Sequence, residues 1–240
     1  MRTSNPALNE KAFAVPLSGH KAMTVDGAIN KSFILIALTV FTFLLSWDFA
    51  LANPNALGFV LIGGLAAFIV ALITIFKQEW SPVTAPIYAL LEGALLGSIS
   101  AVFEAIYPGI VFQAVGLTLA VFLSMLFVYK QKIIKVTDNF RRGLLIATFG
   151  IVVFYLVALV LSFFSISLPV FESGAVGIAF SLIVVAIAAL NLLLDFDFIE
   201  KAAHRAPQYM EWYAGFGLLV TLIWLYLEIL RLLAKLRDNR

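Results

Sequence analysis

Long apolar stretches alternate with short polar links along the chain from residue 32 onward. A helix that crosses a bilayer needs about 20 mostly apolar residues, and seven stretches have this length. They cover residues 32–52, 57–76, 85–106, 108–128, 143–164, 174–194 and 212–233. None shows the alternation of polar and apolar residues that is typical of an outer-membrane β-strand. The pattern therefore predicts an all-α membrane protein with seven transmembrane helices.

The polar links and the ends of the chain set the expected organisation. Asn53-Pro54-Asn55, Trp80-Ser81-Pro82 and Tyr107-Pro108-Gly109 separate neighbouring apolar stretches, as proline and glycine commonly do. We expect a polar N-terminal arm over residues 1–31, a single seven-helix transmembrane domain over 32–236, and a short polar tail over 237–240.

Composition narrows the class of protein further. The 240 residues are 62% hydrophobic and 12% charged, with a net charge of +2 and no cysteine, whereas about 25% charged residues is usual for a soluble domain. These values exclude a soluble domain, a disulfide-stapled secreted fold and a nucleic-acid-binding protein. The sequence has no thiol, no zinc-protease motif, no phosphate-binding loop and no serine-hydrolase motif, so we expect neither an enzyme nor a cofactor.

Lysine and arginine predict the orientation, because loops rich in these residues stay in the cytoplasm. With seven spans, one side of the membrane would hold twelve of them: Arg2, Lys11, Lys21, Lys31, Lys77, Lys130, Lys132, Lys135, Arg141, Arg142, Lys201 and Arg205. The N-terminus is therefore expected in the cytoplasm. The basic residues at the C-terminus would then lie outside, and a six-span arrangement with a re-entrant last segment remains an alternative.

Ionisable residues within apolar stretches are expensive in a bilayer and are candidates for function. Glu92 lies about 10 Å into the third stretch, at a rise of 1.5 Å per residue, and we expect it to line a pathway or to support the last helix. Asn191, a polar but not ionisable residue of the sixth stretch, is assigned the same role as Glu92. The other acidic candidates lie in or beside the last two stretches: Asp195, Asp197 and Glu228.

Helical phase separates the two aspartates. Asn191 and Asp195 are four residues apart and share a face, whereas Asp197 points roughly the other way. We therefore predict that Asp195 faces the interior and that Asp197, a second acidic candidate, is solvated. Alternatives remain: a helix-end carboxylate with local hydrogen bonds for Asp195, and an intrahelical ion pair with Arg231 for Glu228.

Three short segments, in this order, resemble the transmembrane Bax inhibitor motif family. They are Leu91-Glu92-Gly93-Ala94-Leu95-Leu96-Gly97, Leu194-Asp195-Phe196-Asp197-Phe198-Ile199 and Leu225-Tyr226-Leu227-Glu228-Ile229. The resemblance covers about residues 31–236. The opening Ser4-Asn5-Pro6-Ala7-Leu8 is similar to a bacterial subgroup with an extended N-terminal arm.

This resemblance implies a seven-helix protein with a central last helix that passes calcium down its gradient in a pH-sensitive way. A carboxylate pair between the last two helices would form the gate and pH sensor, and by position that pair is Asp195 and Glu228. The same two acids would bind calcium weakly and transiently. This sequence departs from the family pattern in having glutamate as the second acid, Phe196-Asp197 after the first acid, and a longer link between the two helices.

The implied setting is the bacterial inner membrane, with calcium and the lipid bilayer as partners. Two other functions remain open. The chain could be a regulatory protein that binds a membrane partner such as a quality-control protease, or a proton-coupled transporter of small solutes.

Overall fold

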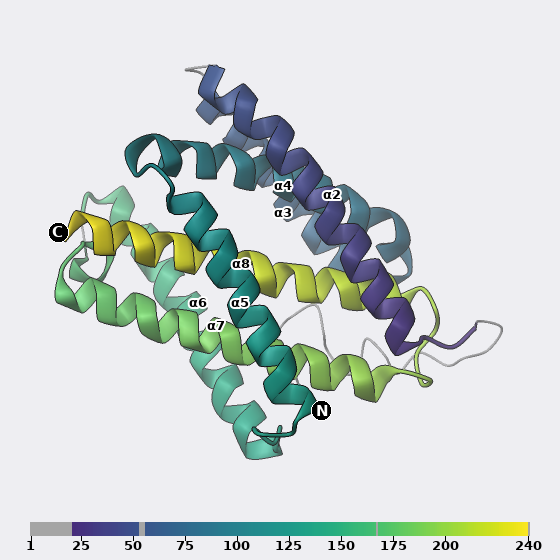
Figure 1. The fold of residues 1–240 in the computed structure, drawn as a ribbon. Coiled ribbons are helices and arrows are strands. Elements are labelled where there is room, and N and C mark those ends of the chain that lie inside the picture. Colours follow the sequence, from purple (N-terminus) through teal and green to yellow (C-terminus); the bar gives the residue numbers. More distant parts are fainter. Residues whose placement is uncertain (1–20, 53–55, 167, 240) are drawn as a thin grey trace. The chain divides into compact units, whose positions relative to one another are not determined.

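The computed structural model describes residues 21–52, 56–166 and 168–239, and within this part the regular structure is helical. The part of the predicted arm before Lys21 lies outside the described residues. Seven long helices occur among the described residues (Figure 1): α2 (Val25–Ala52), α3 (Ala56–Phe76), α4 (Ser81–Ile106), α5 (Ile110–Lys130), α6 (Asp138–Phe163), α7 (Ala175–Ala202) and α8 (Met210–Asp238). Short 3₁₀ helices, η1 (Gln78–Trp80) and η2 (Pro169–Phe171), precede α4 and α7.

Six helices of the described part are long and apolar enough to cross a membrane, and they belong to α2, α4, α5, α6, α7 and α8. In α3 the apolar stretch with described side chains is shorter and covers Ile62–Phe76. The all-α membrane fold predicted from the sequence is thus confirmed. Helix α8 runs without interruption from Met210 to Asp238 (Figure 1), which is not the broken course of a re-entrant segment. It is also the most buried of these six helices, because 61% of the residues in its apolar part are buried.

Several helices extend beyond the apolar stretches predicted from the sequence. The side chain of Thr137 accepts a hydrogen bond from the backbone N–H of Phe140 at 3.2 Å and caps α6. Helix α6 therefore begins at Asp138 and includes Arg141, which the sequence placed in a polar link. Helix α7 likewise continues past Leu194 to Ala202, so both candidate aspartates lie inside a helix.

The chain forms two compact units, and the long helices α7 and α8 contribute to both. Unit 1 contains the described residues up to Pro108 together with Asp197–Val220. Unit 2 contains the described residues of 109–196 and of 221–239.

Unit 1 is organised by a close approach of α4 to α2. A Cβ atom at Gly93 would collide with the carbonyl oxygen of Thr39, and one at Gly97 would collide with that of Phe43. The hydroxyl of Thr39 donates across the same contact to the carbonyl of Ala89 at 3.2 Å. Small residues allow this packing in membrane proteins, where helix association depends on close backbone contact. The pair formed by Gly93 and Gly97 therefore serves packing within the chain.

Unit 2 contains a cluster of aromatic rings beside η2. The ring of Phe154 lies 5.1 Å from Phe180 and 6.0 Å from Phe171, measured between centroids.

The contacts between α6 and α7 give the relative direction of these two helices. The side-chain amide of Asn191 on α7 donates to the hydroxyl of Thr148 on α6 at 3.0 Å. Because residue numbers rise along α6 while their partners on α7 fall from Asn191 to Phe180, these helix segments are antiparallel.

Candidate functional site

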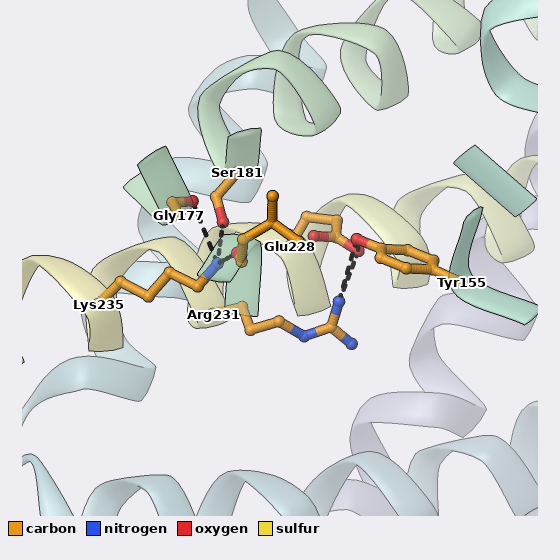
Figure 2. Close-up of polar contacts among 7 residues, drawn as sticks. Tyr155, Gly177, Ser181, Glu228, Arg231 and Lys235 are labelled. Atoms are coloured by element: carbon orange, nitrogen blue, oxygen red, sulfur yellow. Dashed lines mark hydrogen bonds and ion pairs between the residues drawn. The ribbon is translucent and has the colours of Figure 1, made fainter. Parts of the chain in front are cut away.

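The main candidate site lies on the second half of α8, where a carboxylate, a guanidinium and a phenol meet. The Glu228 Oε1 atom accepts hydrogen bonds from the hydroxyl of Tyr155 on α6 and from Nη1 of Arg231, each at 2.9 Å. Arg231 also donates to the Tyr155 hydroxyl at 3.3 Å (Figure 2). The Glu228 side chain is 2% exposed, whereas that of Arg231 is 42% exposed. A buried carboxylate is thus joined to α6 and to a cation that reaches the surface.

The ammonium group of Lys235 is held one turn further along α8. Its Nζ atom donates to the carbonyl oxygens of Val170 and Gly177, at 2.7 and 3.1 Å, and to the hydroxyl of Ser181 at 2.9 Å (Figure 2). Lys235 is buried. A buried ammonium group is tolerated when its donors are satisfied, and these three oxygens connect the end of α8 to η2 and to the start of α7.

The order of residues on α8 explains this arrangement. Glu228, Arg231 and Lys235 are separated by three and four residues, so all three lie on one face of the helix. Ile229 and Leu230 are buried beside them. The sequence thus places a polar stripe of three charges on the apolar last helix of unit 2.

A second group of buried polar residues lies further along α7. Asn191 is buried and bonded to Thr148, and Asp195, one turn later, is 0% exposed. The prediction that Asp195 faces the interior is confirmed. Because α6 and α7 are antiparallel, Asp195 lies within about one helical turn of the level of Arg141, which is also buried in unit 2.

The structure does not bring Asp195 and Glu228 together as a pair. Glu228 bonds Tyr155, whereas Asn191 bonds Thr148, two turns earlier on α6. Asp195 lies one further turn away in the same direction. At 1.5 Å per residue, the two acids are separated by about 16 Å along the helices. The alternative for Glu228, an ion pair with Arg231, is present.

The expectation that Asp197 is solvated is wrong. Its residue is 7% exposed, and its Oδ2 atom lies 2.8 Å from the Nζ atom of Lys201, one turn later. Every residue from Asn191 to Ile199 is buried. Helical phase predicts a solvated side only where one face of a helix remains exposed, and this part of α7 has no exposed face.

Glu92 lies in the interior of unit 1, where it is 9% exposed. It is adjacent to Gly93, the point of closest approach to α2. One turn earlier, the ring of Tyr88 makes an edge contact with Phe216 on α8, with 4.9 Å between centroids. Glu92 is therefore a buried acid beside the α2–α4 contact, and its role in a pathway or in support stays a prediction.

Unit 1 holds another buried acid, Glu211, that the sequence analysis did not single out. Its Oε1 atom accepts from the backbone N–H and the hydroxyl of Thr24, at 3.0 and 3.1 Å. These donors lie at the start of α2, where the helix dipole favours an anion. A Cβ atom at Gly27 would collide with this carboxylate, so the first turn of α2 is shaped to admit it.

Backbone hydrogen bonds fix the segment before α2 against the link between α7 and α8. The N–H of Met23 donates to the carbonyl oxygen of Ala206 at 2.7 Å, and the N–H of Gln208 donates to the carbonyl oxygen of Lys21 at 2.7 Å.

The link between α7 and α8 also contains Tyr209. Burial and the nearby carboxylate of Glu79 raise the pKa of its phenol. The phenol of Tyr209 therefore stays neutral at physiological pH.

Four polar residues of these sites were missed from the sequence: Tyr155, Arg141, Glu211 and Lys235. For Lys235 the sequence did offer a signal. Arg231 follows Glu228 by three residues and Lys235 follows Arg231 by four, which places all three on one face of a helix. Tyr155 lies within an apolar stretch and offered none. Among the described residues, no group of three or more histidine, cysteine, aspartate or glutamate side chains is arranged to hold a metal ion.

The fold and these sites define a multi-pass integral membrane protein with ionisable groups buried among its spanning helices. The family described as Bax inhibitor 1 like matches residues 5–238, almost the whole chain. The protein belongs to this family. No curated protein matches the chain.

Proposed function

We propose that this protein is a pH-sensitive, calcium-permeable leak channel of the bacterial inner membrane, with its N-terminus in the cytoplasm. The single observation that carries the proposal is the buried carboxylate of Glu228, which joins α6 to α8 through Tyr155 and Arg231. An ionisable group at such a position is expensive in a membrane and indicates a function.

Protonation of Glu228 would weaken this connection. It removes the negative charge that holds the Arg231 guanidinium, and Arg231 already reaches the surface, so it can be solvated when released. The attraction between α6 and α8 then falls, because charge-assisted hydrogen bonds are roughly twice as strong as neutral ones. Acid would thus loosen α8 in unit 2 and raise the calcium flux.

Asp195 would act at a separate level, as a weak ligand for the passing ion. It is buried on α7 one turn from the amide of Asn191. Calcium prefers six to eight oxygen ligands, so one carboxylate with amide oxygens, carbonyls and water makes a site that an ion readily leaves. A conducting pathway requires such weak sites. In this proposal Asp195 and Glu228 have separate roles in one pathway and do not share a proton.

The test is calcium uptake into vesicles that contain only the purified protein and a trapped calcium indicator, measured from pH 5 to 8. We expect Glu228→Gln to raise the flux at neutral pH and to flatten its pH dependence, and Asp195→Asn to lower the flux at every pH. Glu79→Gln removes an exposed acid of unit 1 and is the matched control, expected to behave as wild type.

Three results would contradict the proposal. They are calcium uptake no faster than in protein-free vesicles, a Glu228→Gln variant with an unchanged pH profile, and solute-dependent acidification of the vesicle interior without calcium flux. The last result would favour a proton-coupled transporter.

The orientation has its own test. Because the sequence has no cysteine, one introduced cysteine in the link at residues 131–137 is the sole target of a membrane-impermeant maleimide. We expect labelling only after the cells are opened. A cysteine added after Arg240 should label in intact cells if the C-terminus is outside, and labelling of the link in intact cells would reverse the orientation.

A further inference from the structure

A groove of about 750 Å³ in unit 2 lies on the side of the cluster formed by Tyr155 and Arg231. Its walls come from the second half of α6, from the connection that contains η2, and from α8. The lining is mostly apolar and includes Val152, Leu156, Leu159 and Phe171. A groove of this size is within the range of small-molecule sites, and apolar walls in a spanning region suit an acyl chain.

Two opposite charges also line this groove. They are the guanidinium of Arg231 and the carboxylate of Glu172, which is exposed. The ion pair of Arg231 is with Glu228 and not with Glu172. A guanidinium has five N–H donors, and within the described residues Arg231 donates only through its Nη1 atom. A molecule in this groove can therefore contact both the guanidinium of Arg231, which has further N–H donors, and the carboxylate of Glu172.

The two charges lie close together in the groove. The rings of Phe171, the residue before Glu172, and of Tyr155, which bonds Arg231, are 6.1 Å apart between centroids. Leu156 and Val152 lie about 10 and 16 Å before the end of α6. The groove therefore runs from the two charges toward the middle of α6.

We propose that this groove binds one phospholipid with an ethanolamine headgroup. The phosphate binds Arg231, the primary ammonium group donates to the Glu172 carboxylate, and an acyl chain lies on Leu156 and Val152. Arginine is suited to phosphate because its planar fork binds two oxygens at once. An anionic headgroup without an amine leaves Glu172 facing a like charge, and a choline headgroup has no N–H to donate.

Lipid retention can be measured independently of ion flux. The full-length protein in mild detergent is mixed with dioleoyl lipids that carry ethanolamine, glycerol or choline headgroups, and bound lipids are counted by native mass spectrometry. We expect one ethanolamine lipid to be retained about tenfold more tightly than the other two, the size of one charge-assisted hydrogen bond.

Two variants locate the lipid. Glu172→Gln should lower retention of the ethanolamine lipid to that of the choline lipid, and Glu79→Gln, an exposed acid of unit 1, should leave the preference intact. Leu156→Trp fills the groove and should reduce retention of all three lipids. Equal retention of the three headgroups, preference for the glycerol lipid, or an ethanolamine preference that survives Glu172→Gln would each overturn the proposal. None of these results depends on whether the protein conducts calcium.

Discussion

Helix α8 carries one buried glutamate in each unit, and the two are held by different chemistry. In unit 1, Glu211 accepts hydrogen bonds from the backbone and hydroxyl of Thr24 at the start of α2. In unit 2, Glu228 is bonded by Tyr155 and ion-paired with Arg231 in the second half of the helix. Both are nearly inaccessible to solvent. Burial alone therefore does not distinguish their roles.

The partners of each acid make the distinction. Glu211 meets neutral donors, so an oxygen acceptor at this position keeps its hydrogen bonds even without a negative charge. Glu228 holds a cation that can move into solvent, so under the proposed function its charge state sets the strength of the contact between α8 and Tyr155 on α6. Under the proposed function Glu228 is the proton-responsive acid because its counter-ion can be released, whereas Glu211 is held by the fixed N–H and O–H donors of Thr24.

The units also differ in packing, and the largest expected effect tests this difference. In unit 1 the backbones of α2 and α4 meet at Gly93, and the added methyl of Gly93→Ala would collide with a carbonyl oxygen that cannot rotate away. We expect a loss of about 3 kcal/mol in the free energy of unfolding, the upper end of typical overpacking costs. Thermal unfolding in detergent, followed by circular dichroism, measures this loss.

Gly116→Ala is the matched control on α5 of unit 2, where a Cβ atom meets no other atom within 4 Å. Alanine in an open helical position stabilises by about 0.5–1 kcal/mol. If both alanine variants were equally stable, the close approach of α2 and α4 would not be what holds unit 1 together.

The second effect concerns the anchored cation of unit 2. Lys235→Met keeps the length of the side chain but leaves the carbonyls of Val170 and Gly177 and the hydroxyl of Ser181 without their charged donor. We expect a loss of about 2 kcal/mol in the free energy of unfolding. Lys235→Arg offers donors again and should recover part of this loss. A methionine variant as stable as wild type would show that the hydrogen bonds of the Lys235 ammonium group do not stabilise the protein.

The third effect is the coupling between Glu228 and Arg231. A double-mutant cycle with Glu228→Gln and Arg231→Gln isolates their interaction from the cost of each change. Because Arg231 is 42% exposed, we expect a coupling near that of surface pairs, about 1 kcal/mol at pH 7. A coupling near zero at pH 7 would contradict the role of Glu228 as the partner that holds Arg231.

The fold was largely predictable from the sequence, because hydropathy alone sets the number and order of long helices in a membrane. The ends of the helices were less predictable. The Thr137 cap and the continuation of α7 to Ala202 depend on local hydrogen bonds and tertiary burial, which hydropathy does not report.

The candidate site was predictable only in part. Asp195 and Glu228 stand out in the sequence because they are charges in apolar stretches. Their partners do not, because the contact between Tyr155 and Glu228 joins residues 73 positions apart. The solvation of Asp197 was predicted wrongly from helical phase, since phase gives a direction but not what lies in that direction.

The smallest expected effect on stability is that of substitutions at Glu211, at the start of α8. Glu211→Gln keeps an oxygen that can accept from both the N–H and the hydroxyl of Thr24, so only the interaction of the charge with the start of α2 is lost. That interaction contributes about 0.3–1 kcal/mol, whereas Glu211→Ala removes the acceptor and should cost about 1–2 kcal/mol, as the loss of a helix cap does. Thermal unfolding of the two variants should therefore rank glutamine close to wild type and alanine clearly below it. The pH profile of calcium uptake should be the same for Glu211→Gln as for wild type, because in the described part of the chain the hydrogen bonds to this acid come from the neutral donors of Thr24. A flattened profile for Glu211→Gln would place the pH response in unit 1 and would remove the distinction between the two glutamates.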